Sequence, residues 1–337
     1  MVLSRLRNLL GHEQSQVTAE TIRWAYRLIL GREPSPVEVL AHLDHRYPDL
    51  QTLRRVFFNS KEFQLRERSL CSTSLSGFEP ALEIQEEVND ASLEKLLMHI
   101  QQSWQELGQQ EPHWSVLTTE EYKQANLAQN RAQFYASGQR DAACFLNLLR
   151  RNHCFPDGLA DKTILEYGCG VGRITHALAS HFKYVYAYDV SAPHLALARE
   201  FTNEQKLNNI EFKQILSPKD ITNLPRVDAV FTLIVLQHNP PPVISLILRN
   251  LLYALNQNGV AYFQLLTYQE GYSFDINHYL NSAKSRTDQI EMHVLPQNRV
   301  FEIINQANCQ TLEVLEDAWA GYHCGQLSNT FLVRKIC

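Results

Sequence analysis

The stretch Thr163-Ile-Leu-Glu-Tyr-Gly-Cys-Gly-Val-Gly-Arg-Ile-Thr-His-Ala-Leu178 decides the fold of this chain. It begins as a short apolar run typical of a buried strand, passes through glycines 168, 170 and 172, and continues with helical apolar spacing. Glycine reaches backbone angles that other residues avoid and lets a ligand approach the bare main chain. Because ligands of open parallel sheets bind at the carboxyl ends of strands, we expect one at this turn.

Short apolar runs alternate with helical segments after Lys162. We expect strands at residues 163–167, 184–189, 210–215, 227–236, 260–267, 312–315 and 330–333. We expect helices between them at residues 172–181, 193–206, 243–255 and 299–307. This alternation predicts an α/β fold with a Rossmann-like doubly wound sheet, mostly parallel with an antiparallel last strand.

The first part of the chain reads as a small all-α domain over residues 1–68. Thr18 caps a first helix that Gly31 closes, Ser35-Pro36 begins a second, and a third spans residues 50–58. The pattern Tyr26-Arg-Leu-Ile-Leu-Gly-Arg-Glu-Pro34, followed by Phe57-Phe-Asn-Ser-Lys-Glu-Phe63, resembles a small helical domain of unknown function found in bacterial surface and glycan-associated proteins.

A serine-rich stretch then predicts a linker at residues 69–91. Helices at 92–107 and 120–151, the second broken or bent near Ser137-Gly138, indicate that residues 92–160 extend the catalytic domain as a lid. The main domain is expected at residues 161–337.

The composition excludes several classes of protein. The 337 residues carry a formal net charge of −5 spread over both signs, so no basic field favours nucleic acid. The seven cysteines are far apart, without a Cys-x-x-Cys pair, which favours reduced thiols and no metal site. No apolar run approaches the roughly 20 residues of a membrane span, and a secretory signal is not recognisable. We therefore expect a cytoplasmic, bacterial protein that acts on small molecules; the oligomeric state stays open.

The spacing of the glycines separates two cofactor types. Dinucleotide dehydrogenases prefer G-x-G-x-x-G, whose third glycine allows close helix packing, with the pyrophosphate at the helix N-terminus. Here Arg173 stands at the third glycine's position, and the pattern Glu166-x-Gly168-x-Gly170-x-Gly172 resembles the first motif of class I S-adenosylmethionine-dependent methyltransferases. The resemblance implies that S-adenosylmethionine is the cofactor and that Glu166 orients the loop or the cofactor's amino group. It also implies that the turn holds the amino-acid end of the cofactor, through Gly168, Cys169, Gly170, Gly172 and Arg173.

Two further acids are candidate cofactor ligands. Asp189 ends the next strand about 20 residues past the glycines, where a carboxylate can accept both ribose hydroxyl hydrogen bonds; capping the helix after Ser191 is the other interpretation. Val190 and Ser191 follow it as cofactor contacts. By resemblance, Asp220 falls where such enzymes contact the adenine, although a solvated loop carboxylate explains it equally well.

The end of the fourth strand carries candidate chemistry. Its Asn239-Pro-Pro-Pro242 differs from the Asn-Pro-Pro-aromatic site of base methyltransferases, because Pro242 replaces the stacking aromatic. Gln237-His238 instead resembles methyltransferases whose fourth strand ends beside the reacting methyl group. His238 could serve as general base toward a hydroxyl, or it could line the pocket without proton transfer.

Two more regions supply candidates. By its placement, the helix carrying Tyr135 and Gly138 resembles the lid over the cofactor, with packing at a helix bend as the alternative. A long insertion between the fifth strand and the next helix is typical of a substrate pocket. Its substrate-side candidates are Tyr268, Tyr272, Glu291 and His293, and the last two could form a proton relay or half of a metal site.

These features predict methyl transfer from S-adenosylmethionine to an oxygen or nitrogen of a small molecule. The helical N-terminal module suggests a sugar or glycan as acceptor. The alternatives are an NAD-dependent oxidoreductase and a non-catalytic protein that binds the cofactor or a partner.

Overall fold

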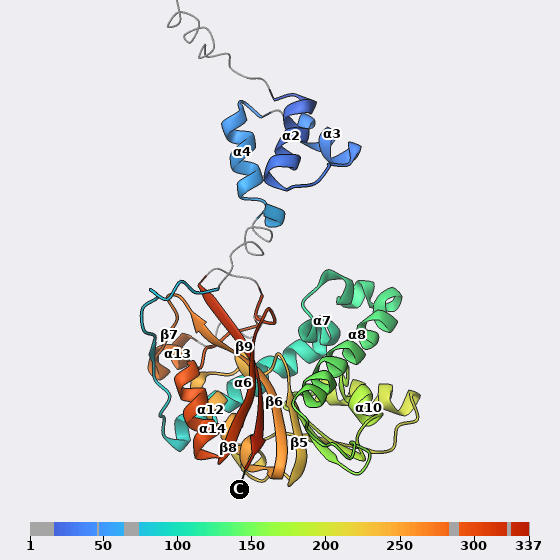
Figure 1. Cartoon of the computed structure of the whole chain (residues 1–337), viewed down its shortest axis with the longest axis vertical. Helices are drawn as coiled ribbons and strands as arrows, with labels where there is room; N and C mark the ends of the chain where they lie inside the picture. Colours follow the sequence, from blue (N-terminus) through green and yellow to red (C-terminus); the bar gives the residue numbers. More distant parts are fainter. Residues whose placement is uncertain (1–16, 46, 64–73, 283–289, 322–324, 337) are drawn as a thin grey trace, which may run out of the picture. The chain divides into compact units, whose positions relative to one another are not determined.

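The computed structural model describes residues 17–45, 47–63, 74–282, 290–321 and 325–336. The chain forms two compact units, residues 1–74 with 322–324, and residues 75–321 with 325–337 (Figure 1). Residues 75–91, which the sequence placed in a linker, thus belong to the second unit. There the short strand β1 (Glu83–Ile84) pairs in parallel with β7 (Ser273–Phe274).

The first unit contains the three expected helices, α2 (Ala19–Ile29), α3 (Pro36–Asp44) and α4 (Leu50–Phe58). The side chains of Thr18, Ser35 and Asp49 accept hydrogen bonds at their N-termini. The apolar faces of the helices meet in a small core, and the Arg32 guanidinium binds the carboxylates of Glu38 and Glu62. Helix caps, one apolar core and an ion-pair cluster therefore hold the three helices of this unit together.

The second unit is built on a seven-stranded sheet in the order β4-β3-β2-β5-β6-β9-β8. Five strands are parallel, and β9 is antiparallel to both of its neighbours. This confirms the predicted mostly parallel sheet with an antiparallel last strand. The strands are β2 (Thr163–Tyr167), β3 (Tyr184–Asp189), β4 (Ile210–Gln214), β5 (Val227–Thr232), β6 (Leu255–Gln269), β8 (Cys309–Asp317) and β9 (Gln326–Lys335).

Helices cover both faces of this sheet (Figure 1). None of the helices in the described ranges is long and apolar enough to cross a membrane. Their bounds are α6 (Asp90–Gln110), α7 (Pro112–Val116), α8 (Gln124–Arg151), α9 (Thr175–Ala179), α10 (Ala192–Glu204), α11 (Pro218–Thr222), α12 (Pro241–Tyr253), α13 (Ile276–Ser282) and α14 (Gln297–Gln306), with 3₁₀ turns η1 (Glu120–Tyr122) and η2 (Leu236–His238).

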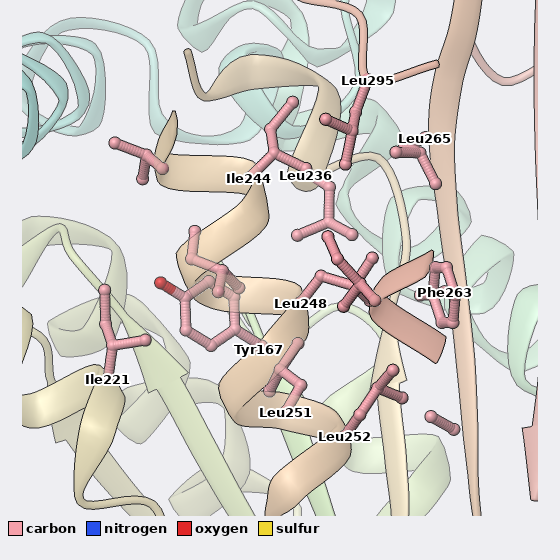
Figure 2. Packing of buried hydrophobic residues seen from close by; sticks show 14 of the residues in the cluster. Tyr167, Ile221, Leu236, Ile244, Leu248, Leu251, Leu252, Phe263, Leu265 and Leu295 are labelled. Carbon is pink, nitrogen blue, oxygen red and sulfur yellow. The ribbon is translucent and has the colours of Figure 1, made fainter. Parts of the chain in front are cut away.

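Each face of the sheet carries its own apolar core. On one face α6, α11, α12 and α14 pack against the strands, and on the other α8, α9 and α10 do so. Figure 2 shows Leu236, Ile244 and Leu295 together in the first of these cores. Leu236 belongs to η2 and Leu295 to the segment after α13, so the core anchors two connections that border the site described below.

Helix α8 is one continuous helix, so it is not broken near Gly138. The glycine serves close packing instead, because a Cβ at Gly138 would lie 1.8 Å from the carbonyl oxygen of Arg173. Tyr135, one turn earlier, stacks on Phe201 with ring centroids 3.4 Å apart. Helix α8 therefore presses against the back of the glycine-rich turn.

This contact predicts that Gly138→Ala lowers the stability of the protein, although the same substitution usually stabilises a helix. In an ordinary helix interior alanine is about 1 kcal/mol more favourable than glycine. Here the added methyl group must displace the backbone at Arg173, and overpacking typically costs about 1–3 kcal/mol. We expect thermal denaturation to show a lower midpoint for Gly138→Ala, while Gln139→Ala on the exposed side of the same helix leaves it unchanged. A Gly138→Ala variant as stable as the parent would contradict the contact.

Candidate functional site

An open cavity with an empty volume of about 860 Å³ lies at the carboxyl ends of β2, β3 and β5, and we call it the inner cavity. The sequence-predicted residues that line it are Glu166, Gly168, Cys169, Gly170, Arg173, Asp189 and Val190. Helices α6 and α7 contribute Ile100, Trp104, Ser115 and Val116. The predicted ligand position at the end of the first strand thus coincides with a real cavity.

The glycines are needed for this cavity to exist. Gly168, Gly170 and Gly172 all have positive φ angles, of 76°, 53° and 79°. A Cβ at Gly168 would lie 2.3 Å from a methyl group of Val235, and one at Gly170 would lie 2.9 Å from a methyl group of Val116. Side chains at these positions would strain the turn and crowd the cavity walls.

Hydrogen bonds within the protein close the turn. The amides of Gly168 and Cys169 both donate to the carbonyl oxygen of Tyr188, at 2.8 and 3.0 Å. The amide of Gly170 donates to Asp189 Oδ2 at 2.8 Å. A pyrophosphate needs such amides free at a helix N-terminus, so this geometry disfavours a dinucleotide.

Asp189 joins the turn to the next helix. Its Oδ1 accepts a hydrogen bond from the amide of Ser191, and its Oδ2 accepts one from Gly170. Each carboxylate oxygen can accept a second hydrogen bond, and the residue lines the inner cavity. The carboxylate can therefore hold the turn and still meet a ribose.

Glu166 and Arg173 provide the strongest sign of a missing ligand. Glu166 Oε2 and Arg173 Nε are buried, and neither has a hydrogen-bond partner among the described residues. The opposite side of the guanidinium binds Asp141 and Ser137 of α8. Buried polar atoms without partners are costly, so these two atoms fit the ammonium and carboxylate of an amino acid. The residues present therefore fit the amino-acid end of S-adenosylmethionine.

Burial also sets the charge of Glu166. Removal from water raises its pKa to about 8, against the weaker opposing effects of the Thr175 hydroxyl and the Arg173 guanidinium. The carboxyl group is thus largely protonated at neutral pH when nothing is bound.

Several predicted cofactor contacts lie outside the inner cavity. Tyr135 and Gly138 pack behind the turn, so the structure gives them the packing role. Asp220 accepts hydrogen bonds from Leu216 and Ser217 at the start of α11, because its side chain caps that helix. Ser191 is buried and donates to the carbonyl oxygen of Trp104.

A second, more open depression, which we call the outer cavity, adjoins the inner one. The two share Ser115, Val116 and Ile234 as lining residues. Its other lining residues include Trp114, Leu117, Glu121, Tyr122, Gln133, Gln237, His238, Ile290, Met292 and Trp319. The predicted residues Gln237 and His238 therefore border this outer cavity and not the inner one, whereas Asn239 lines the inner one.

The bend between β5 and η2 separates the two cavities. The strand ends at Thr232, earlier than the sequence predicted, and Ile234 has a φ of 57°, a strained value for a β-branched residue. Gln264 holds the bend, because its Oε1 accepts from the Ile234 amide and its Nε2 donates to Gln237 Oε1. Strain maintained in this way is typical of functional sites.

His238 follows this bend. Its Nδ1 lies 2.8 Å from the carbonyl oxygen of Glu291, so Nδ1 carries the proton and donates. Nε2 is then the unprotonated nitrogen, and it has no hydrogen-bond partner among the described residues. Burial lowers the pKa of His238 to about 4, with a smaller lowering by His293, so the imidazole is neutral at pH 7.

The predicted residues of the insertion form a polar cluster behind His238. Glu291 Oε2 accepts from Tyr279 and pairs with His293 Nε2, while His293 Nδ1 meets the Tyr272 hydroxyl. Within the described residues, no group of three or more His, Cys, Asp or Glu side chains is arranged to hold a metal ion. Tyr268 lies apart from the cluster, with its hydroxyl donating to the carbonyl oxygen of Pro80.

The sequence did not single out the side chains that α6, α7 and α10 contribute to the inner cavity. Trp104 lines this cavity and approaches the His238 ring edge-on, with ring centroids 5.7 Å apart. His194 also lines that cavity and bonds to Ser115 and Ser191. Two tryptophans close in sequence, Trp104 and Trp114, were the sequence feature that could have indicated these contributions. Their positions at the cavities depend on how α6 and α7 pack against the sheet, which the sequence pattern does not give.

Comparisons with known proteins agree with this geometry. A family profile described as a methyltransferase domain matches residues 164–259, which run from β2 into β6. Among solved structures, the magnesium protoporphyrin IX methyltransferase of Synechocystis PCC 6803 has a TM-score of 0.50 at 15% identity, covering 71% of this chain and 99% of that chain. At this identity the likeness concerns the fold.

The curated relatives are named ubiquinone biosynthesis O-methyltransferase. The protein from Glaesserella parasuis is 24% identical over 187 residues, covering 53% of this chain and 76% of that protein. The one from Pseudomonas paraeruginosa is 34% identical over 86 residues, covering 25% of this chain and 37% of that protein. Three others match over 41%, 47% and 46% of their length, so apart from the first relative the chain spans less than half of these proteins.

The raised pKa of Glu166 predicts proton release on cofactor binding. An ammonium group beside Glu166 favours the carboxylate, so at pH 7 the complex should lose a proton that the free protein holds. Calorimetry in buffers of different ionisation enthalpy measures this release, and the affinity for S-adenosylmethionine should rise from pH 6 to pH 7.5.

Glu166→Gln should remove both the proton release and the rise in affinity. Asp220→Asn, a change to a carboxylate that caps α11 away from the cavity, serves as the matched control and should keep both. Proton release that persists in Glu166→Gln would assign the titration to another group.

Proposed function

Because this chain carries a class I S-adenosylmethionine-dependent methyltransferase domain with S-adenosylmethionine as its cofactor, we propose that the protein methylates a hydroxyl oxygen of a small, ring-bearing molecule in the outer cavity. The observation that carries the proposal is His238, which lines the outer cavity and whose unprotonated Nε2 has no hydrogen-bond partner among the described residues. A hydroxyl acceptor supplies the hydrogen-bond donor that this nitrogen lacks.

The inner cavity would hold the cofactor through residues of the first motifs. Glu166 and Arg173 would bind its ammonium and carboxylate, and Asp189 its ribose hydroxyls. When bound, S-adenosylmethionine supplies an electrophilic methyl group on a positively charged sulfur. The shared wall of Ser115, Val116 and Ile234 would place an acceptor beside the cofactor, and alignment of the reacting groups is the main requirement of a direct displacement.

The low pKa of His238 selects among hydroxyl acceptors. A base with a pKa of about 4 removes a proton more readily from an acidic hydroxyl than from an aliphatic one. A phenol has a pKa of about 10, as tyrosine does, and is far more acidic than an alcohol. A phenolic ring is therefore the leading acceptor, and the outer cavity's apolar residues Leu117, Ile290 and Met292 suit it. The relatives' name, an O-methyltransferase of ubiquinone biosynthesis, is in line with an oxygen acceptor.

A sugar is the second candidate acceptor. Trp114, Tyr122 and Trp319 line the outer cavity together with the polar side chains of Glu121 and Gln133. Aromatic rings stack on the apolar face of a sugar while polar groups bind its hydroxyls. The resemblance of the N-terminal helices to glycan-associated modules supports this class, whereas nitrogen acceptors and nucleic acid have no comparable support in the site.

We also propose that residues 92–160 act as the lid of the catalytic domain. Helices α6 and α7 line the inner cavity, and the segment through η1 lines the outer one. The lid would therefore contact the two ligands through α6, α7 and η1, with α8 behind the turn.

The proposed role of His238 predicts a distinct pH profile. Since the base must be unprotonated and its pKa is about 4, kcat should stay level from pH 7.5 down to about 5.5, where a histidine of ordinary pKa would already lose activity. His238→Gln should lower kcat by roughly 10²- to 10⁴-fold without weakening S-adenosylmethionine binding. His181→Gln, at an exposed histidine, should change neither. Turnover unaffected by His238→Gln would reject this residue as the base.

The acceptor class can be tested with a panel of phenols, sugars and amines, scored by mass spectrometry for a methyl group gained. We expect phenols to be methylated best. Trp319→Ala should raise KM for the acceptor several-fold and leave the Kd of S-adenosylmethionine unchanged, because Trp319 lines only the outer cavity. Gln139→Ala on the exposed side of α8 is the control. Exclusive methylation of sugars would replace the phenol proposal by the second candidate.

A further inference from the structure

We propose that Glu291 and His293 are positioning residues that hold His238 in one tautomer, with the proton on Nδ1 and Nε2 facing the acceptor. The significance of this tautomer for methyl transfer rests on the function proposed above. The tautomer itself is a property of the protein alone and can be measured without any acceptor.

Two hydrogen bonds join the segment 291–293 to the turn that carries His238. The Nδ1 of His238 donates to the carbonyl oxygen of Glu291 at 2.8 Å, and the amide of His293 donates to the carbonyl oxygen of Gln237 at 2.7 Å. A carbonyl oxygen only accepts hydrogen bonds, so the first contact exists only when Nδ1 is protonated. The second contact fixes the segment beside the turn.

The side chains of this segment are themselves held in place. The Glu291 carboxylate accepts from the Tyr279 hydroxyl at 2.5 Å and lies 3.1 Å from His293 Nε2. Nδ1 of His293 lies 2.8 Å from the hydroxyl of Tyr272. Nε2 of His99 lies 3.9 Å from Glu291 Oε1 on the side of α6. Groups from α13 and α6 thus surround the Glu291 carboxylate, and Tyr272 before β7 holds its neighbour His293.

This carboxylate stays charged despite its partial burial. Burial opposes its ionisation, but hydrogen bonds from His293 and Tyr279, together with the nearby His99 imidazole, outweigh burial and lower the pKa of Glu291 below its usual range. A charged, multiply bonded carboxylate fixes the geometry of its segment more firmly than a neutral side chain would. The position of the Glu291 carbonyl oxygen, and with it the orientation of His238, depends on these contacts.

The tautomer decides what His238 can do. With the proton on Nδ1, Nε2 can accept the hydrogen of a hydroxyl group. In the other tautomer Nε2 would carry the proton and could only donate, so it could not remove a proton from the acceptor. Glu291 and His293 act through His238 and do not line the outer cavity, which distinguishes them from catalytic residues and from a proton relay at the acceptor.

Nitrogen NMR of the full chain, labelled with ¹⁵N-histidine, tests the inference directly. The His238 signals are assigned by their absence in His238→Gln. We expect the parent protein at pH 7 to show one tautomer, with Nδ1 protonated and Nε2 unprotonated. Glu291→Ala should produce a mixture of tautomers, and Tyr279→Phe a smaller change, whereas Glu94→Ala on the exposed face of α6 should leave the spectrum unchanged. A mixture in the parent protein, or a single tautomer kept in a folded Glu291→Ala variant, would overturn the inference.

Turnover then separates this inference from the proposed function. If both hold, Glu291→Ala lowers kcat by roughly 10- to 100-fold with little change in the Kd of S-adenosylmethionine. If the tautomer is lost in Glu291→Ala but turnover is unchanged, the positioning of His238 stands and its role as base fails. Should Glu291→Ala not fold, the parent spectrum and the Tyr279→Phe spectrum still decide the matter, because both concern the same hydrogen bonds.

Discussion

The hydrogen bonds that tie the glycine-rich turn to the end of β3 are the constraint on which the site depends. Two amides of the turn share the carbonyl oxygen of Tyr188, and a third binds Asp189. They bend the chain sharply after β2, and the glycines adopt the resulting positive φ angles without the strain that a side chain would bring. The bend places Glu166 before the turn and Arg173 after it on the same cavity, although neither bonds to the other. A ligand with an ammonium and a carboxylate group would supply the hydrogen-bond partners that Glu166 and Arg173 lack within the described residues.

The two cavities differ in how their polar groups are satisfied. The inner cavity keeps buried atoms of Glu166 and Arg173 that have no partner among the described residues, whereas Gln237 in the wall of the outer cavity belongs to a chain of hydrogen bonds. That chain runs from Gln237 through Gln264 to Ser328 and Asp317. Completed buried networks rigidify a structure, and this one maintains the strained Ile234 between the cavities. The inner cavity is thus prepared for a charged ligand, and the boundary between the two cavities is held fixed.

The sequence predicted what depends on local patterns. Apolar runs and glycine spacing gave the strands, their mainly parallel arrangement and the place of the inner cavity, because each depends on a few neighbouring residues. The continuity of α8 was missed, since only the contact with Arg173 explains Gly138. Asp220 caps α11 and does not line the inner cavity, because a carboxylate three residues after a serine caps a helix as readily as it binds a ligand. The roles of Trp104 and His194 depend on the folding of α6 and α7 across the sheet, which no short pattern encodes.

Burial shifts the pKa values of Glu166 and His238 in opposite directions, and both shifts favour the neutral form of the side chain. Removal from water disfavours charge, so it raises the pKa of the carboxyl group and lowers that of the imidazole, and both are mainly neutral at pH 7. Beside them, the charged pair Arg173–Asp141 is neutral as a whole. The neutral forms of Glu166 and His238 spare the free site the cost of burying their charges. A cationic cofactor changes this balance at Glu166, next to its ammonium group. His238 borders the outer cavity, so it can remain neutral and able to accept a proton. Because the two cavities are separate, the protein can bind a cationic cofactor in one and hold an unprotonated histidine at the other.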